Sequence, residues 1–256
     1  MLIFPKSRIV FIAVPKSGST SIISSVNKDY LPFEPGIYHS KSSETRLLLK
    51  NNKKDFLKFI GEEGVSLDDY KLILENIKNY QTFAVIRDPI QRIRSYFCEI
   101  HEGLHIDYYN LKELKILQFL DFIIDNDDGS LPIHLLPSYR FLNEISNLQL
   151  FLFEDIKILW RILNRYNSNK AALSHDRDTR DSPMRGIFND YVTNNRKLQT
   201  RLQQRYSIDF KTHSLLLERN PISDKSAYAM IASKAKKSTR FYNAYVQIIK
   251  SFFNRS

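Results

Sequence analysis

One stretch near the start of the chain, Arg8 to Ser21, constrains the fold more than any other. Its first part, Ile9 to Val14, is an unbroken apolar and β-branched run, which is typical of a buried central strand. Pro15 cannot continue a central strand, so we expect the strand to end there. A lysine, four hydroxyl residues and one glycine follow, and apolar residues then recur at helical spacing. The order strand, polar turn and helix predicts an anion site, because the dipole and first-turn amides of a helix favour negative charge.

A second unit of the same kind spans Thr82 to Phe97. Phe83 to Ile86 is predicted to be another buried strand, with Arg87 directly after it. Pro89 suits the first turn of the helix that follows. Ligands of open α/β sheets bind outside the carboxyl ends of the strands, so we expect Lys16 and Arg87 to lie at the same edge.

A third apolar run, Leu148 to Phe153, precedes a predicted helix that reaches about Tyr166. Alternating strands and helices predict an α/β fold, a three-layer sandwich with a mainly parallel sheet. We expect a single domain over residues 1–256, in which a basic, helical C-terminal extension covers about 211–256.

Composition limits the classes of function. With 43% hydrophobic residues the chain can bury a core, and its single cysteine, Cys98, excludes an intrachain disulfide. No run approaches the ~20 apolar residues of a membrane span, so we predict a soluble, cytoplasmic protein. The net charge of +10 favours anionic ligands such as nucleotides, nucleic acids or acidic glycans. No clustered set of His, Cys and Asp is present, so we expect no metal.

The order of lysine and glycine in the first loop separates it from common nucleotide-binding loops. A Walker A loop places its lysine after the second glycine, whereas Lys16 precedes Gly18 here. The GxGxxG pattern of dinucleotide-binding folds is absent as well. The sequence therefore indicates a phosphate-loop shape without the usual ATPase parts.

Together, the segments PKSGSTS and RDPIQRIRSY resemble the PAPS-dependent sulfotransferases, whose donor is 3′-phosphoadenosine-5′-phosphosulfate. In that family the first loop holds the 5′-phosphosulfate and the second motif holds the 3′-phosphate. The resemblance implies a P-loop NTPase-like sulfotransferase fold, with PAPS as co-substrate. It implies contacts to the 5′ end from Lys16, Ser17, Gly18, Ser19, Thr20 and Ser21, and contacts to the 3′-phosphate from Arg87 and Ser95.

Further segments resemble carbohydrate sulfotransferases of the heparan sulfate 2-O-sulfotransferase-like branch. The segment GIYHS is similar to one that carries a catalytic histidine there, which implies that His39 is the general base. His134 is the alternative base, and Lys41 stands where that segment has a second histidine. The resemblance implies transfer of a sulfuryl group from PAPS to a hydroxyl, with a glycan as the expected acceptor. Lys16 would stabilise the leaving phosphate.

Two other functions remain open at this stage. One is a non-enzymatic binder of nucleic acid or acidic glycan, which the net charge favours, although we expect no specific nucleic acid partner. The other is an atypical small-molecule kinase.

Arg185-Gly186 only weakly resembles a 3′-phosphate contact of other sulfotransferases and is not counted among the site residues. The acceptor, the sulfated position and the oligomeric state are left undetermined.

Overall fold

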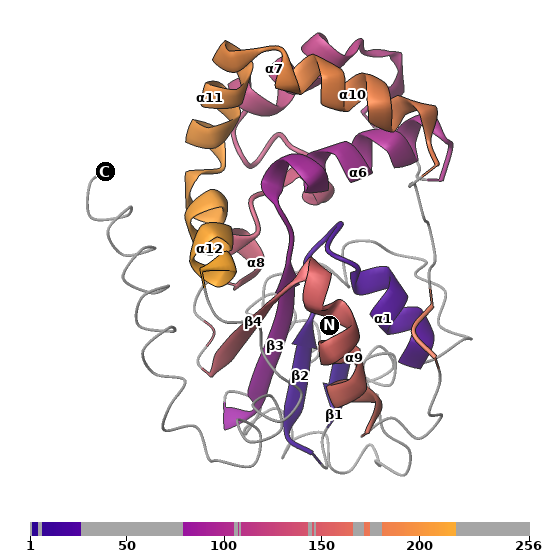
Figure 1. Ribbon diagram of the computed structural model, residues 1–256, viewed down its shortest axis with the longest axis vertical. Coiled ribbons are helices and arrows are strands. Elements are labelled where there is room, and N and C mark those ends of the chain that lie inside the picture. Colours follow the sequence, from indigo (N-terminus) through magenta and orange to yellow (C-terminus); the bar gives the residue numbers. More distant parts are fainter. Residues whose placement is uncertain are drawn as a thin grey trace.

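A computed structural model gives the architecture (Figure 1). It describes residues 2–4, 7–26, 79–104, 107, 109–142, 145, 147–165, 172–174 and 181–218. Four strands form one sheet in the order β1-β2-β3-β4. Their bounds are Leu2–Phe4 for β1, Ile9–Ile12 for β2, Gln81–Ile86 for β3 and Leu148–Leu152 for β4.

The sheet is mixed but mainly parallel. Strands β2, β3 and β4 run parallel, with Ile12 opposite Ala84 and Ile86 opposite Leu152, while β1 pairs antiparallel with β2. The predicted α/β class and all three predicted strands are therefore confirmed. Strand β1 was not predicted, because three residues are too few to carry a periodic signal.

Helices cover both faces of the sheet (Figure 1). Alternate residues of β3 point to opposite faces, as the pleat requires. Phe83 and Val85 pack in a cluster with α1 and α9, whereas Ala84 and Ile86 join a cluster with α8 and α12. The bounds are Ser19–Val26 for α1, Tyr139–Leu142 for α8, Ile156–Asn164 for α9 and Ser207–Leu217 for α12.

Four more helices form a group beyond the carboxyl end of β3, with a separate hydrophobic cluster built around Phe97 and Phe119 (Figure 1). They are α6 (Pro89–His101), α7 (Ile116–Asp125), α10 (Pro183–Thr193) and α11 (Arg196–Arg205). Short 3₁₀ turns lie at Leu111–Glu113, Ile133–Leu135 and Phe153–Asp155. Helix α6 follows β3 directly, so it connects this group to the sheet.

The expected C-terminal extension is described only over its first residues. Residues 211–217 belong to α12, whose Leu216 packs in the core against the sheet. Residues 219–256 lie outside the described part. Among the described helices, none combines the length and the apolar character needed to cross a membrane.

A buried carboxylate fastens α12 to the helical group. The Asp209 carboxylate accepts hydrogen bonds from the Ser138 amide at 2.6 Å and the Tyr139 amide at 3.2 Å. It also lies 3.7 Å from a guanidinium nitrogen of Arg92, a fully buried side chain. Burial raises the pKa of Asp209, and the Arg92 charge and the Ser138 amide oppose that rise. Asp209 therefore stabilises the junction of α6, α8 and α12.

Replacing Asp209 by alanine should lower the free energy of unfolding by roughly 3–5 kcal/mol, because the Arg92 charge would stay buried without its partner. Urea unfolding measures this. Asp121→Ala is the matched control, since Asp121 pairs with Arg201 at a solvent-accessible position, where a pair is worth at most about 1 kcal/mol. Equal losses in the two variants would contradict this role for Asp209.

Candidate anion-binding site

The loop between β2 and α1 has two residues in the left-handed region of backbone space. Lys16 has φ 62° and Gly18 has φ 77°. Left-handed geometry strains any residue other than glycine by about 1–2 kcal/mol, and such strain is typical of functional sites. Helix α1 begins at Ser19, so its first-turn amides, which have no acceptor within the helix, belong to this loop.

Close packing also favours glycine at position 18. A Cβ atom there would lie 2.3 Å from Ile156 Cδ1 and 3.0 Å from a ring carbon of Phe153. Both neighbours come from the segment that leaves β4, so the loop lies directly against that segment. Backbone conformation and close packing therefore both favour the one glycine in the predicted anion loop.

Each residue of the Arg87-Asp88-Pro89 segment has its own part in starting α6. The Asp88 carboxylate accepts a hydrogen bond from the Gln91 amide at 2.9 Å and caps the helix, and Pro89 occupies the first turn. Arg87 has a different role, because its side chain extends from the end of β3 toward the loop that carries Lys16. A guanidinium NH2 group of Arg87 donates to the Lys16 carbonyl at 3.5 Å, and its guanidinium stacks 4.3 Å from the Phe153 ring centroid. The two predicted anion-binding units thus meet.

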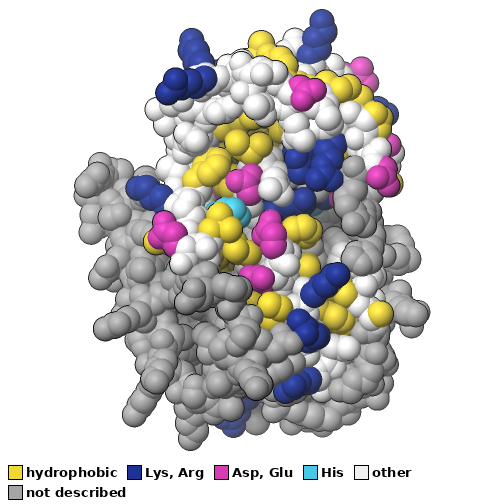
Figure 2. Space-filling view, viewed as in Figure 1, with side chains coloured by type: hydrophobic (Ala, Val, Ile, Leu, Met, Phe, Trp, Pro, Cys, Tyr) yellow, Lys and Arg dark blue, Asp and Glu magenta, His cyan; other side chains and the backbone are white. Residues whose placement is uncertain are grey.

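Three arginines concentrate positive charge near this junction. Burial, followed by the charges of Arg94 and Arg185, lowers the pKa of Arg87 to about 10. Burial and Arg185 also lower the pKa of Arg94, which donates to the Asn189 side chain at 2.6 Å. Lys and Arg side chains gather over α6 in Figure 2. Mutual repulsion of this kind is relieved when an anion binds among the cations.

Buried polar atoms without a hydrogen-bond partner also gather here. In the described part of the chain there are six such side-chain atoms, and three belong to Ser17, Arg87 and Glu99. Ser17 follows Lys16 in the loop, and Arg87 and Glu99 both contact Lys16. Buried polar groups are normally satisfied, so the free Ser17 hydroxyl and Arg87 Nε are suited to a ligand oxygen.

Sequence reasoning missed one charged member of the site. Lys16 Nζ forms a buried ion pair with Glu99 Oε1, and the two side chains are 9% and 3% exposed. Glu99 lies on α6 four residues after Ser95, so both residues share one face of the helix. That spacing was the only signal available in the sequence, and it did not show which residue Glu99 would contact.

The remaining predicted residues are placed as follows. Ser19, Thr20 and Ser21 form the first turn of α1, and Ser95 lies partly buried on α6. His39 lies outside the described residues.

His134, the alternative base, is 7% exposed and stacks on Tyr96 with ring centroids 5.1 Å apart. The structure therefore gives His134 a packing contact beneath α6.

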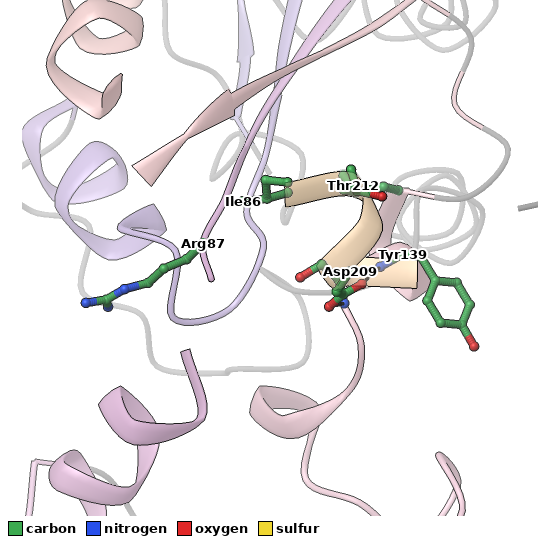
Figure 3. Close-up of a pocket in the computed structure, with 7 residues that line it drawn as sticks. Ile86, Arg87, Tyr139, Asp209 and Thr212 are labelled. Carbon is green, nitrogen blue, oxygen red and sulfur yellow. Dashed lines mark hydrogen bonds between the residues drawn. The ribbon is translucent and has the colours of Figure 1, made fainter. Parts of the chain in front are cut away.

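A small hollow lies beside the end of β3 (Figure 3). It holds about 210 Å³, part of it open to solvent, and is lined by Ile86, Arg87, Ser138, Tyr139, Leu142, Asp209 and Thr212. In Figure 3 the Arg87 side chain extends away from Asp209, Tyr139 and Thr212. The positive charge is thus directed toward the β2–α1 loop and away from this hollow.

Comparison with protein families gives the class of protein. The Sulfotransferase family model matches residues 1–214, which is most of the chain. The chain therefore belongs to the sulfotransferase family, and it is a transferase of sulfuryl groups in the general sense of that family. Comparisons with curated proteins and with solved structures found no match.

Within the described residues, no group of three or more His, Cys, Asp or Glu has the arrangement of a metal site.

Gly18→Ala should destabilise the protein more than Gly103→Ala. Both glycines have positive φ, but nothing lies within 4 Å of a Cβ at position 103. Gly103→Ala should cost about 1–2 kcal/mol from backbone strain alone. Gly18→Ala should cost about 1 kcal/mol more, because Ile156 must leave its rotamer and Phe153 must shift. Chemical denaturation measures both, and equal costs would show that the close contact is unimportant.

Proposed function

We propose that this protein transfers a sulfuryl group from PAPS to a hydroxyl group of an acceptor. One observation supports this most: the Lys16 loop and Arg87, which follow adjacent parallel strands, meet at one edge of the sheet. A donor with an anionic group at each end fits two neighbouring anion sites. The proposal includes a P-loop NTPase-like, three-layer arrangement, which agrees with helices on both faces of the sheet.

The charges favour a strongly anionic ligand at the Arg87 end. Arg87 repels Arg94 and Arg185, and the nearby acids Asp88 and Glu154 offset only part of this. A 3′-phosphate monoester can carry two negative charges and accept several charge-assisted hydrogen bonds. Arg87 would contact this group together with Ser95, the residue that the family resemblance assigns to it.

At the other end, the loop would hold the 5′-phosphosulfate. Ser17, Gly18, Ser19, Thr20 and Ser21 would supply hydroxyl and amide donors to its oxygens. The bond between sulfur and the bridging oxygen breaks, a bond from sulfur to the acceptor oxygen forms, and the acceptor proton passes to a base. Negative charge then grows on the released phosphate oxygen. The Lys16 ammonium would stabilise it, as in phosphoryl transfer, where positioning and electrostatics do most of the catalysis.

We assign the general base to His39, on the family resemblance. A neutral imidazole accepts a proton near physiological pH. His134 is the second candidate, but its ring is buried against Tyr96. The acceptor is proposed to be a glycan hydroxyl, as in the heparan sulfate 2-O-sulfotransferase-like branch, and the protein is proposed to act in the cytoplasm.

Lys16→Ala should lower kcat at least about a hundredfold, because one stabilising donor is removed from the transition state. Arg87→Ala should weaken PAP binding by roughly ten- to a hundredfold, since a charge-assisted contact is lost. Transfer of labelled sulfate and calorimetry with PAP measure these effects. Lys197→Ala and Arg196→Ala, at exposed positions of α11, are matched controls. Unchanged transfer in both site variants would exclude the proposed function.

His39→Ala should depress kcat by about a hundredfold or more while PAP affinity stays unchanged, because a base acts only on the acceptor. In the native protein kcat should fall on acidification, since a protonated imidazole cannot accept a proton, and the variant should lose this dependence. Steady-state kinetics across pH measures both. If His134→Ala produced this pattern and His39→Ala did not, the base would be His134.

A further inference from the structure

The lysine of the anion loop is paired with a negative charge from α6. The Glu99 carboxylate projects from the third turn of α6 and pairs with the Lys16 ammonium. Both side chains are almost completely buried, so solvent screens the pair weakly. Arg87 contacts the carbonyl of the same lysine. Lys16 therefore joins the anion loop, the end of β3 and α6 at one point.

One carboxylate oxygen of this ion pair is not hydrogen-bonded. Glu99 Oε2 is buried and has no hydrogen-bond partner. A buried ion pair repays its desolvation cost only when the remaining lone pairs are also satisfied. Stability alone therefore gives little reason for a glutamate at this position, and its contact with Lys16 points to a role in the anion site.

We propose that Glu99 is a positioning residue: it is the internal counter-ion that holds the Lys16 ammonium in the donor-free protein, and the anionic group of the donor displaces it. The inference rests on the proposed function in one respect, the assignment of Lys16 to the 5′ end of the donor. The ammonium has three N–H donors, so it can turn from the carboxylate to the incoming anion. The glutamate keeps the lysine in place and lowers the affinity for anions.

Removing only the charge of Glu99 tests this role. Glu99→Gln keeps the shape of the side chain, and it should lower the Kd for PAP about tenfold, because the anion no longer breaks a charge-assisted contact. Inorganic sulfate, measured in the same way, should also bind more tightly. Glu102→Gln makes the same charge change at the C-terminal end of the same helix, where Glu102 contacts Ser182, and should leave both affinities unchanged.

Stability measurements test the ion pair without any ligand. Lys16→Met and Glu99→Gln should each raise the unfolding constant, because each leaves its partner without a charged neighbour. The unfolding constant of the double variant should be roughly tenfold lower than the product of the two single-variant effects predicts. If Glu99→Gln did not fold, Glu99→Met, which has a similar length and no charge, would take its place in every measurement.

The outcomes separate this inference from the proposed function. If the native protein binds PAP and Glu99→Gln binds it equally or more weakly, the counter-ion role is overturned and the proposed function stands. If the native protein neither binds PAP nor transfers sulfate, the proposed function fails. The counter-ion role is then tested by the binding of inorganic sulfate alone. Tighter sulfate binding by Glu99→Gln then supports the counter-ion role, and unchanged sulfate binding overturns it.

Discussion

The parallel pairing of β2 with β3 is the constraint on which the site depends. Its register brings Ile12 beside Ala84, so both strands end at the same edge of the sheet. The loop with Lys16 follows one strand and Arg87 follows the other, and the two units meet although 71 residues separate them in sequence. Backbone hydrogen bonds between the strands therefore bring together two units that are distant in the sequence. The helices on both faces support this arrangement, because their apolar side chains pack the strands between two cores.

The sequence was sufficient to predict these two units because each is a local pattern. A buried strand, a proline that ends it or begins a helix, and a cation at the junction are all read within about ten residues. The α/β class and the three parallel strands follow from those patterns. Strand β1 did not, since its three residues show no periodicity. The role of Gly18 was predictable as a flexible turn, but its close approach to Ile156 depends on a segment far along the chain.

Residues that complete the site come from contacts that no local pattern encodes. Arg185 lies on α10, and its charge acts on Arg87 and Arg94 because α10 packs against α6 through apolar residues such as Phe97 and Phe188. A weak sequence resemblance suggested this arginine without placing it. Glu99 is similar: its position on α6 is evident from the sequence, whereas its contact with Lys16 depends on the angle at which α6 leaves β3. Long-range packing therefore decides the electrostatic balance of the site, and the strand patterns decide only where the site lies.

Among the described residues, helix α6 takes part in two buried ion pairs, and their surroundings differ. Both oxygens of Asp209 accept backbone amides, and the terminal nitrogens of Arg92 donate to the carbonyls of His134 and Leu136. Apart from Arg92 Nε, which has no partner, that pair is hydrogen-bonded on both sides, so breaking it would leave several more groups unsatisfied. The pair of Lys16 and Glu99 has a free carboxylate oxygen and lies in a strained loop beside an unpartnered hydroxyl, Ser17 Oγ. We therefore expect exchange of one anionic partner for another to cost less at Lys16 than at Arg92, as the proposed binding and release of a donor in each catalytic cycle would require.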